Sequence, residues 1–364
     1  MKKKVLAVGI AIAALGVVLA LLPTTPVPLP SPEEISDTGI EIVVSDIRIP
    51  WAIDFATDGR LFFTERMGNV RVIENGELLK EPVFATEVAK VGEGGMLGLA
   101  LDPNFDSNHF IYIYYTYVDA KGSIWNKVVQ LSEQNNKASE EKVLIDKIPG
   151  AALHDGGRIK FGPDSKLYIT TGDAGNPGSS QDLKSLAGKI LRINPDGSLP
   201  ADNPFPNSAV YSFGHRNPQG IAWHPDTKEL YATEHGPVGN DEINVIKAGM
   251  NYGWPVEQCV AEKFVAPIMC YEVTVAPAGA IFYSSNRLPY TNDLFFGTLR
   301  GKHVEHIMFD SNGTKAENFL AGFGRIRDIV EGPDGYLYIA TSNRDGRGLP
   351  ASDDDKILRI TKAR

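Results

Sequence analysis

The sequence repeats one short unit along most of its length. Each copy has an apolar run, a turn rich in Asp, Pro and Gly, and a second apolar run with many residues that favour β-strands. This pattern is typical of a β-hairpin. Six copies lie at residues 53–64, 99–112, 159–171, 221–233, 280–296 and 329–341, the fifth looser than the others. A further strand-like segment, KILRI at residues 189–193, recurs letter for letter at residues 356–360.

Repeated small antiparallel sheets predict a β-propeller. The six hairpins indicate six blades, so the expected fold class is all-β. A two-sheet sandwich is the alternative, but it would not require a repeated unit. Residues 40–44 precede the first hairpin, and we expect them to pair into the last blade and close the ring, which removes open sheet edges. Helical periodicity is limited to residues 182–186 and 242–248.

Composition excludes some classes of function. The chain has 364 residues, 43% of them hydrophobic, and can bury the core of a single large all-β domain. Its net charge of -9 argues against nucleic acid or an anionic membrane surface as the main partner. Cys259 and Cys270 are the only cysteines, and their spacing fits no zinc site. The sequence leaves open whether they form a disulfide.

The N-terminus predicts a targeting segment. Three lysines precede an apolar run over residues 5–22, which ends in Leu-Leu-Pro without a small-residue cleavage motif. We expect residues 1–22 to be a signal peptide or, in better agreement with the length of the run, an uncleaved membrane anchor. Residues 23–38 would be a Pro-rich tether, and residues 39–364 the catalytic propeller. The basic N-terminus then predicts an extracytoplasmic protein, either secreted or anchored to the outer face of the cytoplasmic membrane.

The third hairpin carries a candidate general base. His154 lies just before its first strand and Asp173 just after its second. The start of the first strand and the end of the second meet at one end of a hairpin, so we expect the two side chains to lie close together. A carboxylate behind an imidazole fixes its tautomer and stabilises its protonated form, which suits proton abstraction.

Polar residues of other hairpins fall at the same end. The innermost strands of a propeller all run in one direction, so residues that enter them surround one mouth of the central channel. They include Glu93, His154, His215, Arg216, Asn217, Arg325 and Arg327, and the ends of the second strands add Asp173, His235, Asn343 and Arg344. An acidic protein that gathers Arg216, Arg300, Arg325 and Arg327 toward one pocket is expected to bind a polyanionic ligand there.

Taken in order, these segments resemble the soluble quinoprotein glucose dehydrogenases, and more closely the related aldose sugar dehydrogenases. The matching segments are GEGGMLG at residues 92–98, HDGGR at 154–158, TGD at 171–173, GHRNPQG at 214–220, EHGP at 234–237, DEIN at 241–244, NYGWP at 251–255 and RIRD at 325–328. The resemblance covers about residues 50–362. It implies a six-bladed propeller that binds pyrroloquinoline quinone (PQQ) and calcium.

The resemblance also implies roles for individual residues. His154 would take the proton of the sugar C1 hydroxyl while hydride passes to the quinone, and Asp173 would orient the imidazole. Arg216 would stabilise the quinone oxygen that becomes negative. The remaining cofactor-binding residues would be Glu93, Asn217, Arg300, Arg325 and Arg327.

Two calcium sites are implied in the same way. The backbone carbonyls of Gly236 and Pro237 would hold a catalytic calcium that polarises the quinone carbonyl. Glu242 and the carbonyl of Tyr252 would hold a structural calcium, because hard cations prefer oxygen ligands. The expected partners are a small aldose substrate and a soluble or membrane electron acceptor, with a possible membrane tether through the N-terminal segment.

Some positions depart from the pattern of the glucose dehydrogenases. Those enzymes have Gln where this chain has Glu93, an acidic residue at Leu153, a Trp over the quinone where Glu272 stands, and often Lys at Arg300. The departures predict a more open pocket and looser sugar selectivity. The alternative functions are a calcium-dependent lactonase-type hydrolase, which would need carboxylates and amides rather than arginines around its metal, and a non-catalytic binding propeller.

Overall fold

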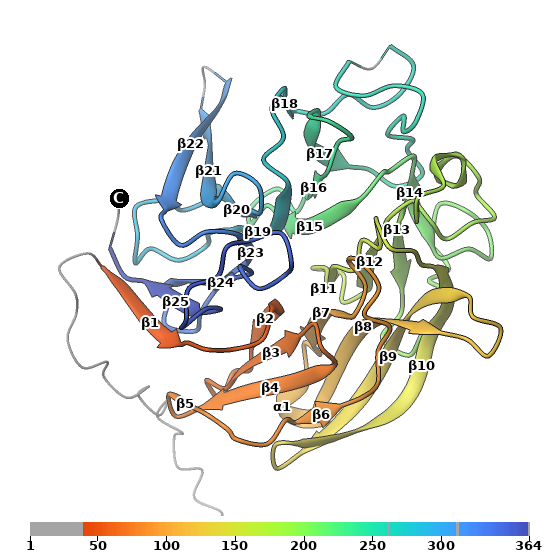
Figure 1. Ribbon diagram of the computed structural model, residues 1–364. Coiled ribbons are helices and arrows are strands. Elements are labelled where there is room, and N and C mark those ends of the chain that lie inside the picture. The colour runs from red at the N-terminus through yellow and green to blue at the C-terminus, as the bar shows by residue number, and fades with distance from the viewer. Residues whose placement is uncertain (1–38, 261, 311–312, 363–364) are drawn as a thin grey trace, which may run out of the picture.

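The structure is a computed structural model that describes residues 39–260, 262–310 and 313–362. The predicted anchor and tether, residues 1–38, lie outside these residues. The described chain forms six antiparallel sheets arranged around a central axis (Figure 1). The predicted fold class, an all-β six-bladed propeller, is therefore confirmed. Within the described residues, no helix has the length and apolar character needed to cross a bilayer.

Each blade contributes four main strands from the axis outward. The innermost strands are β2 (Pro50–Phe55), β7 (Met96–Leu101), β11 (Ile159–Phe161), β15 (Pro218–Trp223), β19 (Pro277–Phe282) and β23 (Ile326–Glu331). The second strands are β3 (Leu61–Glu65), β8 (Phe110–Val118), β12 (Leu167–Thr171), β16 (Leu230–Glu234), β20 (Leu294–Thr298) and β24 (Leu337–Thr341). The first and second strands correspond to the six hairpins of the sequence.

The outer half of each blade completes its sheet. The third strands are β4 (Asn69–Glu74), β9 (Ile124–Gln134), β13 (Lys189–Ile193), β17 (Asp241–Ile246), β21 (His303–Asp310) and β25 (Ile357–Ile360). The outermost strands are β5 (Glu77–Leu78), β10 (Lys137–Pro149), β14 (Val210–Phe213), β18 (Met269–Tyr271), β22 (Gly313–Ala321) and β1 (Ile40–Val44), and β6 (Phe84–Ala85) also pairs with β4. The repeated KILRI segments thus occupy equivalent strands, β13 and β25.

Helical structure is short. It consists of α1 (Phe105–Asn108) and a 3-10 turn, η1 (Pro177–Ser180). The helical periodicity at residues 242–248 is misleading, because most of this segment belongs to β17. Neighbouring blades cover both faces of β17, so its buried residues follow one another without the alternation that marks a half-exposed strand.

The first strand of the fold closes the ring. β1 pairs with β25 in the sixth blade, with Ile40 opposite Ile360 and Glu41 opposite Arg359. The Arg359 guanidinium lies 2.6 Å from Glu41 and 2.7 Å from Asp334. This pairing joins the two ends of the propeller, as the sequence predicted, and covers the outer edge of β25.

The core lies between the blades rather than along the axis. Separate clusters of buried side chains join neighbouring blades, and the largest connects blades 1 to 3. The other clusters join blades 3 and 4, 4 and 5, 5 and 6, and 6 and 1. Because the first strand of every blade is innermost, the loops that enter these strands and leave the second strands share one rim of the disc.

We predict that the closing strands contribute strongly to stability. Ile360 is fully buried in the cluster that joins blades 5 and 6, so Ile360→Ala should lower the free energy of unfolding by about 2–5 kcal/mol. Ile42, on the partner strand, is 59% exposed, and Ile42→Ala should cost less than about 1 kcal/mol. Urea unfolding of both variants measures the difference. Equal effects would contradict the placement of the core at this blade interface.

Candidate active site

The third blade brings His154 and Asp173 together. His154 precedes β11 and Asp173 follows β12, and the imidazole Nδ1 lies 2.7 Å from Asp173 Oδ1. The backbone of His154 is in the left-handed region, with a φ of 63°. A Cβ at Gly172 would lie only 1.9 Å from the carbonyl oxygen of His154, so this close approach requires glycine. The chain therefore holds His154 through its backbone as well as its side chain.

The Asp173 carboxylate is fully buried, and both of its oxygens accept hydrogen bonds. Oδ1 also accepts the backbone N–H of Gly175 at 2.8 Å, and Oδ2 accepts the indole N–H of Trp254 at 2.9 Å. Burial opposes ionisation, but the hydrogen bond and charge of His154 lead the interactions that lower the pKa of Asp173 below its ordinary value. The ionised carboxylate occupies Nδ1 and leaves Nε2 of the imidazole available to accept a proton.

Glu93 reaches the same loop from the second blade. Its Oε2 accepts the backbone N–H of His154 at 3.1 Å, and its Oε1 lies 3.2 Å from the guanidinium of Arg347. Burial opposes ionisation, but His235 and the N–H of His154 lower the pKa of Glu93. Glu93 is therefore an anion that ties the second blade to the third.

Arg216 and Asn217 lie in the loop before β15. Nη1 of Arg216 donates hydrogen bonds to the carbonyls of His235 at 3.1 Å and Gly236 at 2.8 Å. Oδ1 of Asn217 accepts the backbone N–H of Gly156 at 3.0 Å. Each side chain also keeps one buried donor, Arg216 Nε and Asn217 Nδ2, that has no partner among the residues the structure describes. Burial lowers the pKa of Arg216, although an arginine at this position remains cationic.

The sixth blade supplies Arg325 and Arg327. Arg325 forms an ion pair of 2.7 Å with Asp345 and donates to the carbonyl of Leu299 at 3.0 Å. Arg327 donates from Nη1 to the side chain of Gln219 at 2.6 Å, while its buried Nε has no partner within the described chain. Burial, and next the charge of Arg325, lower the pKa of Arg327 to about 9 against the opposing charge of Asp345.

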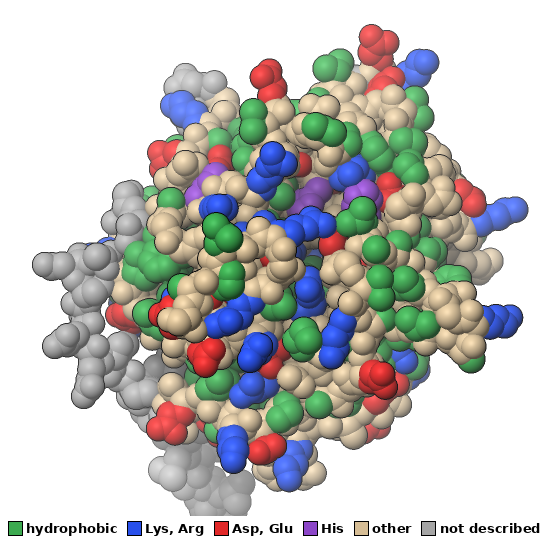
Figure 2. Space-filling view, viewed as in Figure 1, with side chains coloured by type: hydrophobic (Ala, Val, Ile, Leu, Met, Phe, Trp, Pro, Cys, Tyr) green, Lys and Arg blue, Asp and Glu red, His purple; other side chains and the backbone are tan. Residues whose placement is uncertain are grey.

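These residues form one electrostatic unit, which we call the rim cluster. It consists of Glu93, His154, Asp173, Arg216, Asn217, Arg325 and Arg327. The charge of Glu93 acts on both Arg216 and Arg327, so residues from different blades lie within range of one another. Figure 2 shows Lys and Arg side chains gathered near the centre of the face in view. Arg300 differs from the cluster, because it is exposed and its only described hydrogen bond is a backbone bond to Val275.

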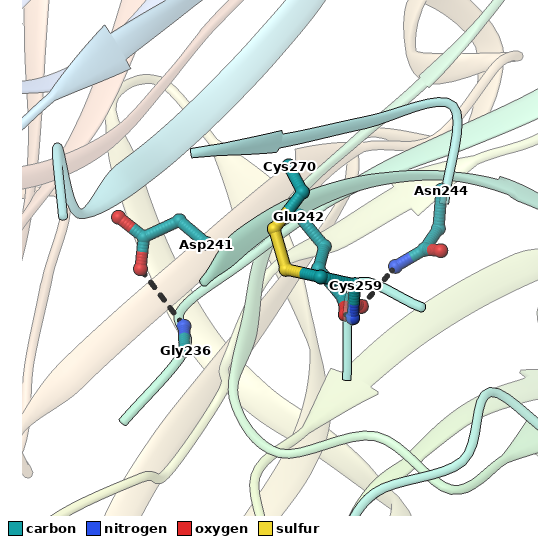
Figure 3. Close-up of a disulfide and its surroundings, with 6 residues drawn as sticks. All are labelled: Gly236, Asp241, Glu242, Asn244, Cys259 and Cys270. Carbon is teal, nitrogen blue, oxygen red and sulfur yellow. Dashed lines mark hydrogen bonds between the residues drawn. A yellow bond between two sulfur atoms is a disulfide. The ribbon is translucent and has the colours of Figure 1, made fainter. Parts of the chain in front are cut away.

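Gly236 and Pro237 lie in the loop between β16 and β17. The Gly236 N–H donates to Asp241 at 2.8 Å (Figure 3), and the Gly236 carbonyl accepts the hydrogen bond from Arg216. The other carboxylate oxygen of Asp241 accepts the backbone N–H of Val275 at 2.7 Å. Pro237 is exposed. A buried carboxylate therefore fixes this loop directly beside the rim cluster.

Glu242 lies beside a disulfide (Figure 3). Its carboxylate accepts the backbone N–H of Cys259 at 2.7 Å and the side-chain N–H of Asn244 at 3.1 Å. Cys259 is bonded to Cys270 with their Cα atoms 5.5 Å apart, which settles the pairing that the sequence left open. Burial, and next the charge of Glu234, raise the pKa of Glu242 to about 7.

Tyr252 packs close to this group. Its ring stacks on His215 with ring centroids 4.7 Å apart, and its backbone N–H donates to Phe213 at 2.9 Å. In the part of the chain that the structure describes, no three His, Cys, Asp or Glu side chains converge as metal ligands. The predicted cation sites therefore depend on backbone carbonyls and on Glu242.

Comparison with known proteins identifies the family. The model of the Glucose / Sorbosone dehydrogenase family matches residues 47–351. The chain belongs to this family. The resemblance drawn from the sequence segments is thereby confirmed.

Relatives in this family include characterised sugar dehydrogenases. The aldose sugar dehydrogenase YliI of Escherichia coli K12 is 32% identical over 344 residues, which cover 86% of this chain and 92% of that protein. The PQQ-bound aldose sugar dehydrogenase of Streptomyces coelicolor is 34% identical with a TM-score of 0.79, covering 88% of this chain and 97% of that one. An oxidoreductase (glucose dehydrogenase) of Thermus thermophilus is 40% identical with a TM-score of 0.81, covering 88% and 98%.

The rim cluster of this dehydrogenase family member fits an anionic quinone. Three buried donors, Nε of Arg216, Nε of Arg327 and Nδ2 of Asn217, have no partner among the described residues. An unpaired buried donor is costly, and a ligand rich in carbonyl and carboxylate oxygens would pair with all three. The donors thus match the chemistry of PQQ, which carries both kinds of oxygen.

The group around Glu242 fits a hard cation. Oδ1 of Asn244 is buried without a partner among the described residues, and it belongs to the same amide that donates to Glu242. Glu234 lies opposite Glu242 in the pairing of β16 with β17, and its charge opposes ionisation of Glu242. A cation would relieve this repulsion, and oxygen is the ligand that calcium prefers.

Sequence reasoning missed four residues that shape the rim cluster. They are Gln219, Trp254, Asp345 and Arg347, which contact Arg327, Asp173, Arg325 and Glu93 respectively. Gln219 and Trp254 stood in matched segments, but nothing in the sequence shows which way their side chains point. Asp345 and Arg347 lie in the loop after β24, which carries no motif.

Asp155, which follows His154, makes stability depend on pH. Burial raises its pKa to about 6 from an ordinary 3.8, and its Oδ2 has no partner within the described chain. The native state therefore holds a proton that the unfolded chain releases, and this stabilisation is present below about pH 4 and lost as pH rises through 6.

We predict that Asp155→Asn raises the free energy of unfolding at pH 8 relative to the wild type and changes it little at pH 4. Urea unfolding at both pH values measures the effect. The exposed Asp226, changed to Asn, is the control and should show no such difference. If Asp155→Asn shifts stability equally at both pH values, the carboxyl titrates normally.

Proposed function

We propose that the protein is a quinoprotein aldose sugar dehydrogenase that uses PQQ and calcium and oxidises the C1 hydroxyl of aldoses to lactones. Family membership and the PQQ-bound Streptomyces coelicolor relative support this proposal. The observation that carries it is the His154–Asp173 pair beside arginines that retain unpaired buried donors. A base and an anion-binding group at one rim suit the removal of a proton and a hydride from one carbon.

His154 is the proposed base. The O–H bond of the C1 hydroxyl breaks and its proton passes to Nε2, while the C1–H bond breaks and leaves with its electron pair as hydride, so that a C1 carbonyl forms. When bound, the quinone supplies the two-electron oxidant that receives this hydride. Asp173 holds the imidazole in the required tautomer and stabilises its protonated form.

The arginines bind and stabilise negative charge. Arg216 would donate to the cofactor oxygen that gains charge, where a preorganised donor in a partly buried site is most effective. Arg325 and Arg327 would pair with the cofactor carboxylates. Glu93 and Asn217 would line the cofactor, and Arg300 would add a carboxylate contact from the exposed side of the site.

Calcium completes the proposal at two places. The carbonyls of Gly236 and Pro237 would hold one ion, which supplies Lewis-acid polarisation. Glu242 and the carbonyl of Tyr252 would hold a second, structural ion. Leu153 and Glu272, at positions where the glucose dehydrogenases differ, are both exposed, which supports an open site with loose sugar selectivity.

The proposed setting is extracytoplasmic. The three lysines and the apolar run of residues 5–22 support an uncleaved anchor or a signal peptide, followed by the Pro-rich tether of residues 23–38. A protein so placed would deliver electrons from the reduced cofactor to a soluble or membrane acceptor.

Reconstitution tests the proposed function. Protein supplied with calcium and PQQ should reduce a redox dye in the presence of an aldose. His154→Gln should lower turnover by about 10²-fold or more, because only proton abstraction is lost, while PQQ binding measured by absorbance titration stays nearly unchanged. His109→Gln, an exposed histidine outside the rim cluster, is the control. Confirmed PQQ binding without dye reduction for any aldose would overturn the proposal.

Calcium binding at Glu242 should stabilise the fold. Chelation should lower the melting temperature of the wild type, and calcium at a hundred times its Kd should restore about 2.7 kcal/mol of stability. Glu242→Gln should abolish this calcium-dependent gain, whereas the exposed Glu77→Gln should retain it. Differential scanning calorimetry with and without chelator measures the gain. A wild-type melting temperature that ignores calcium would refute the structural site.

A further inference from the structure

One aromatic side chain contacts both halves of the proposed chemistry. The indole N–H of Trp254 donates to Oδ2 of Asp173 at 2.9 Å, and Asp173 in turn binds His154. The guanidinium carbon of Arg216 lies 5.3 Å from the centroid of the Trp254 ring. Trp254 therefore touches the partner of the base on one side and the anion-binding arginine on the other.

We propose that Trp254 is a positioning residue for the reaction. Its N–H fixes the carboxylate that orients His154, and its ring supports Arg216, so one side chain sets the position of the base relative to that of the anion-binding group. This inference rests on the proposed function.

The carboxylate depends on this donor. Oδ1 of Asp173 has two described partners, the His154 imidazole and the Gly175 N–H, whereas the described partner of Oδ2 is the indole of Trp254. Asp173 is fully buried, so water cannot replace a lost donor without a rearrangement. A buried carboxylate oxygen without a donor is costly, and rotation of the carboxylate to recover a partner would pull Oδ1 away from the imidazole.

Arg216 depends on the ring in a different way. Its Nη1 is held by two backbone carbonyls, of His235 and Gly236, but its Nε has no described partner. The face of the Trp254 ring is then the support on one side of the guanidinium plane, through the attraction between a cation and an aromatic face. Loss of the ring would leave the guanidinium held only at one nitrogen.

The segment that carries Trp254 is itself fixed to the fourth blade. Its backbone N–H donates to the carbonyl of Gly214 at 2.9 Å, and its carbonyl accepts the side-chain N–H of Gln181 at 2.6 Å. Gln181 also exchanges hydrogen bonds with the side chain of Asn251 at 2.7 and 3.1 Å. The indole thus has a rigid base, which a positioning role requires.

The chain offers a matched control. The indole N–H of Trp125 donates to Oδ2 of Asp119, also at 2.9 Å, on a different blade and outside the rim cluster. Trp125→Phe and Trp254→Phe therefore remove the same kind of hydrogen bond and keep an aromatic ring. Any loss that comes from a missing indole–carboxylate bond in general should appear in both variants.

Two readouts test the proposal, and one of them needs no cofactor. In protein without cofactor, we expect the downfield proton resonance of the His154 Nδ1–H···Asp173 bond, assigned by its absence in His154→Gln, to broaden or shift in Trp254→Phe and to persist in Trp125→Phe. In protein reconstituted with calcium and PQQ, we expect kcat of Trp254→Phe to fall about 10-fold or more, while the PQQ Kd changes less than about threefold.

The pH profile of kcat/KM adds a signature that a structural defect would not produce. The acidic groups that act on His154 are Asp173, Glu93 and Asp155, and all remain in Trp254→Phe. Loss of the Trp254 donor leaves more negative charge on Asp173, which favours the protonated imidazole. The acid limb of the profile should therefore move to higher pH in Trp254→Phe and not in Trp125→Phe.

The outcomes separate this inference from the proposed function. A wild type that binds PQQ but oxidises no aldose refutes the function, and the resonance still decides the positioning role. A wild-type resonance and wild-type kcat in Trp254→Phe overturn the inference, as do equal losses in Trp125→Phe. If Trp254→Phe alone melts lower, 3-benzothienylalanine at position 254, which keeps the bicyclic ring without the N–H, must reproduce the resonance and pH effects for the proposal to stand.

Discussion

Closure of the ring is the constraint on which the site depends. β1 from the start of the described chain pairs with β25 from its end, so the sixth blade is complete only when both are in place. The rim cluster draws residues from blades 2, 3, 4 and 6, and no single blade contains it. If the ring opened at blade 6, Arg325 and Arg327 would be free to move away from Arg216. The closed ring, rather than any local motif, is therefore what places the arginines near His154.

Charge in the rim cluster is only partly compensated by the protein. Burial of guanidiniums carries a desolvation cost that paired carboxylates can offset. Asp345 compensates Arg325, and Glu93 compensates Arg347, but Arg216 and Arg327 each keep a buried Nε without a described partner. Since the whole chain carries a net charge of -9, this excess of positive charge is local. A cluster left incomplete in this way is built for an anionic ligand rather than for stability alone.

Sequence reasoning succeeded where a contact follows from hairpin geometry. His154 and Asp173 flank one hairpin, so the turn chemistry of residues 162–165 was enough to place them side by side. It failed where a contact depends on the path of an irregular loop. Trp254 lies 81 residues beyond Asp173, and nothing periodic in that interval predicts their hydrogen bond. Arg300 shows the related difficulty, since the end of its strand was foreseen but the exposed direction of its side chain was not.

The accuracy of a site built on loops comes from hydrogen bonds that cross between blades. Glu93 of the second blade accepts the N–H of His154, and the Asp173 N–H donates to the carbonyl of Arg216 in the fourth blade at 2.8 Å. Arg216 then reaches the carbonyl of Gly236 at 2.8 Å. Each loop is thus fixed by its neighbour, so displacement of one would disturb the next. Such a chain of contacts explains how residues outside the regular strands can hold the fixed geometry that catalysis requires.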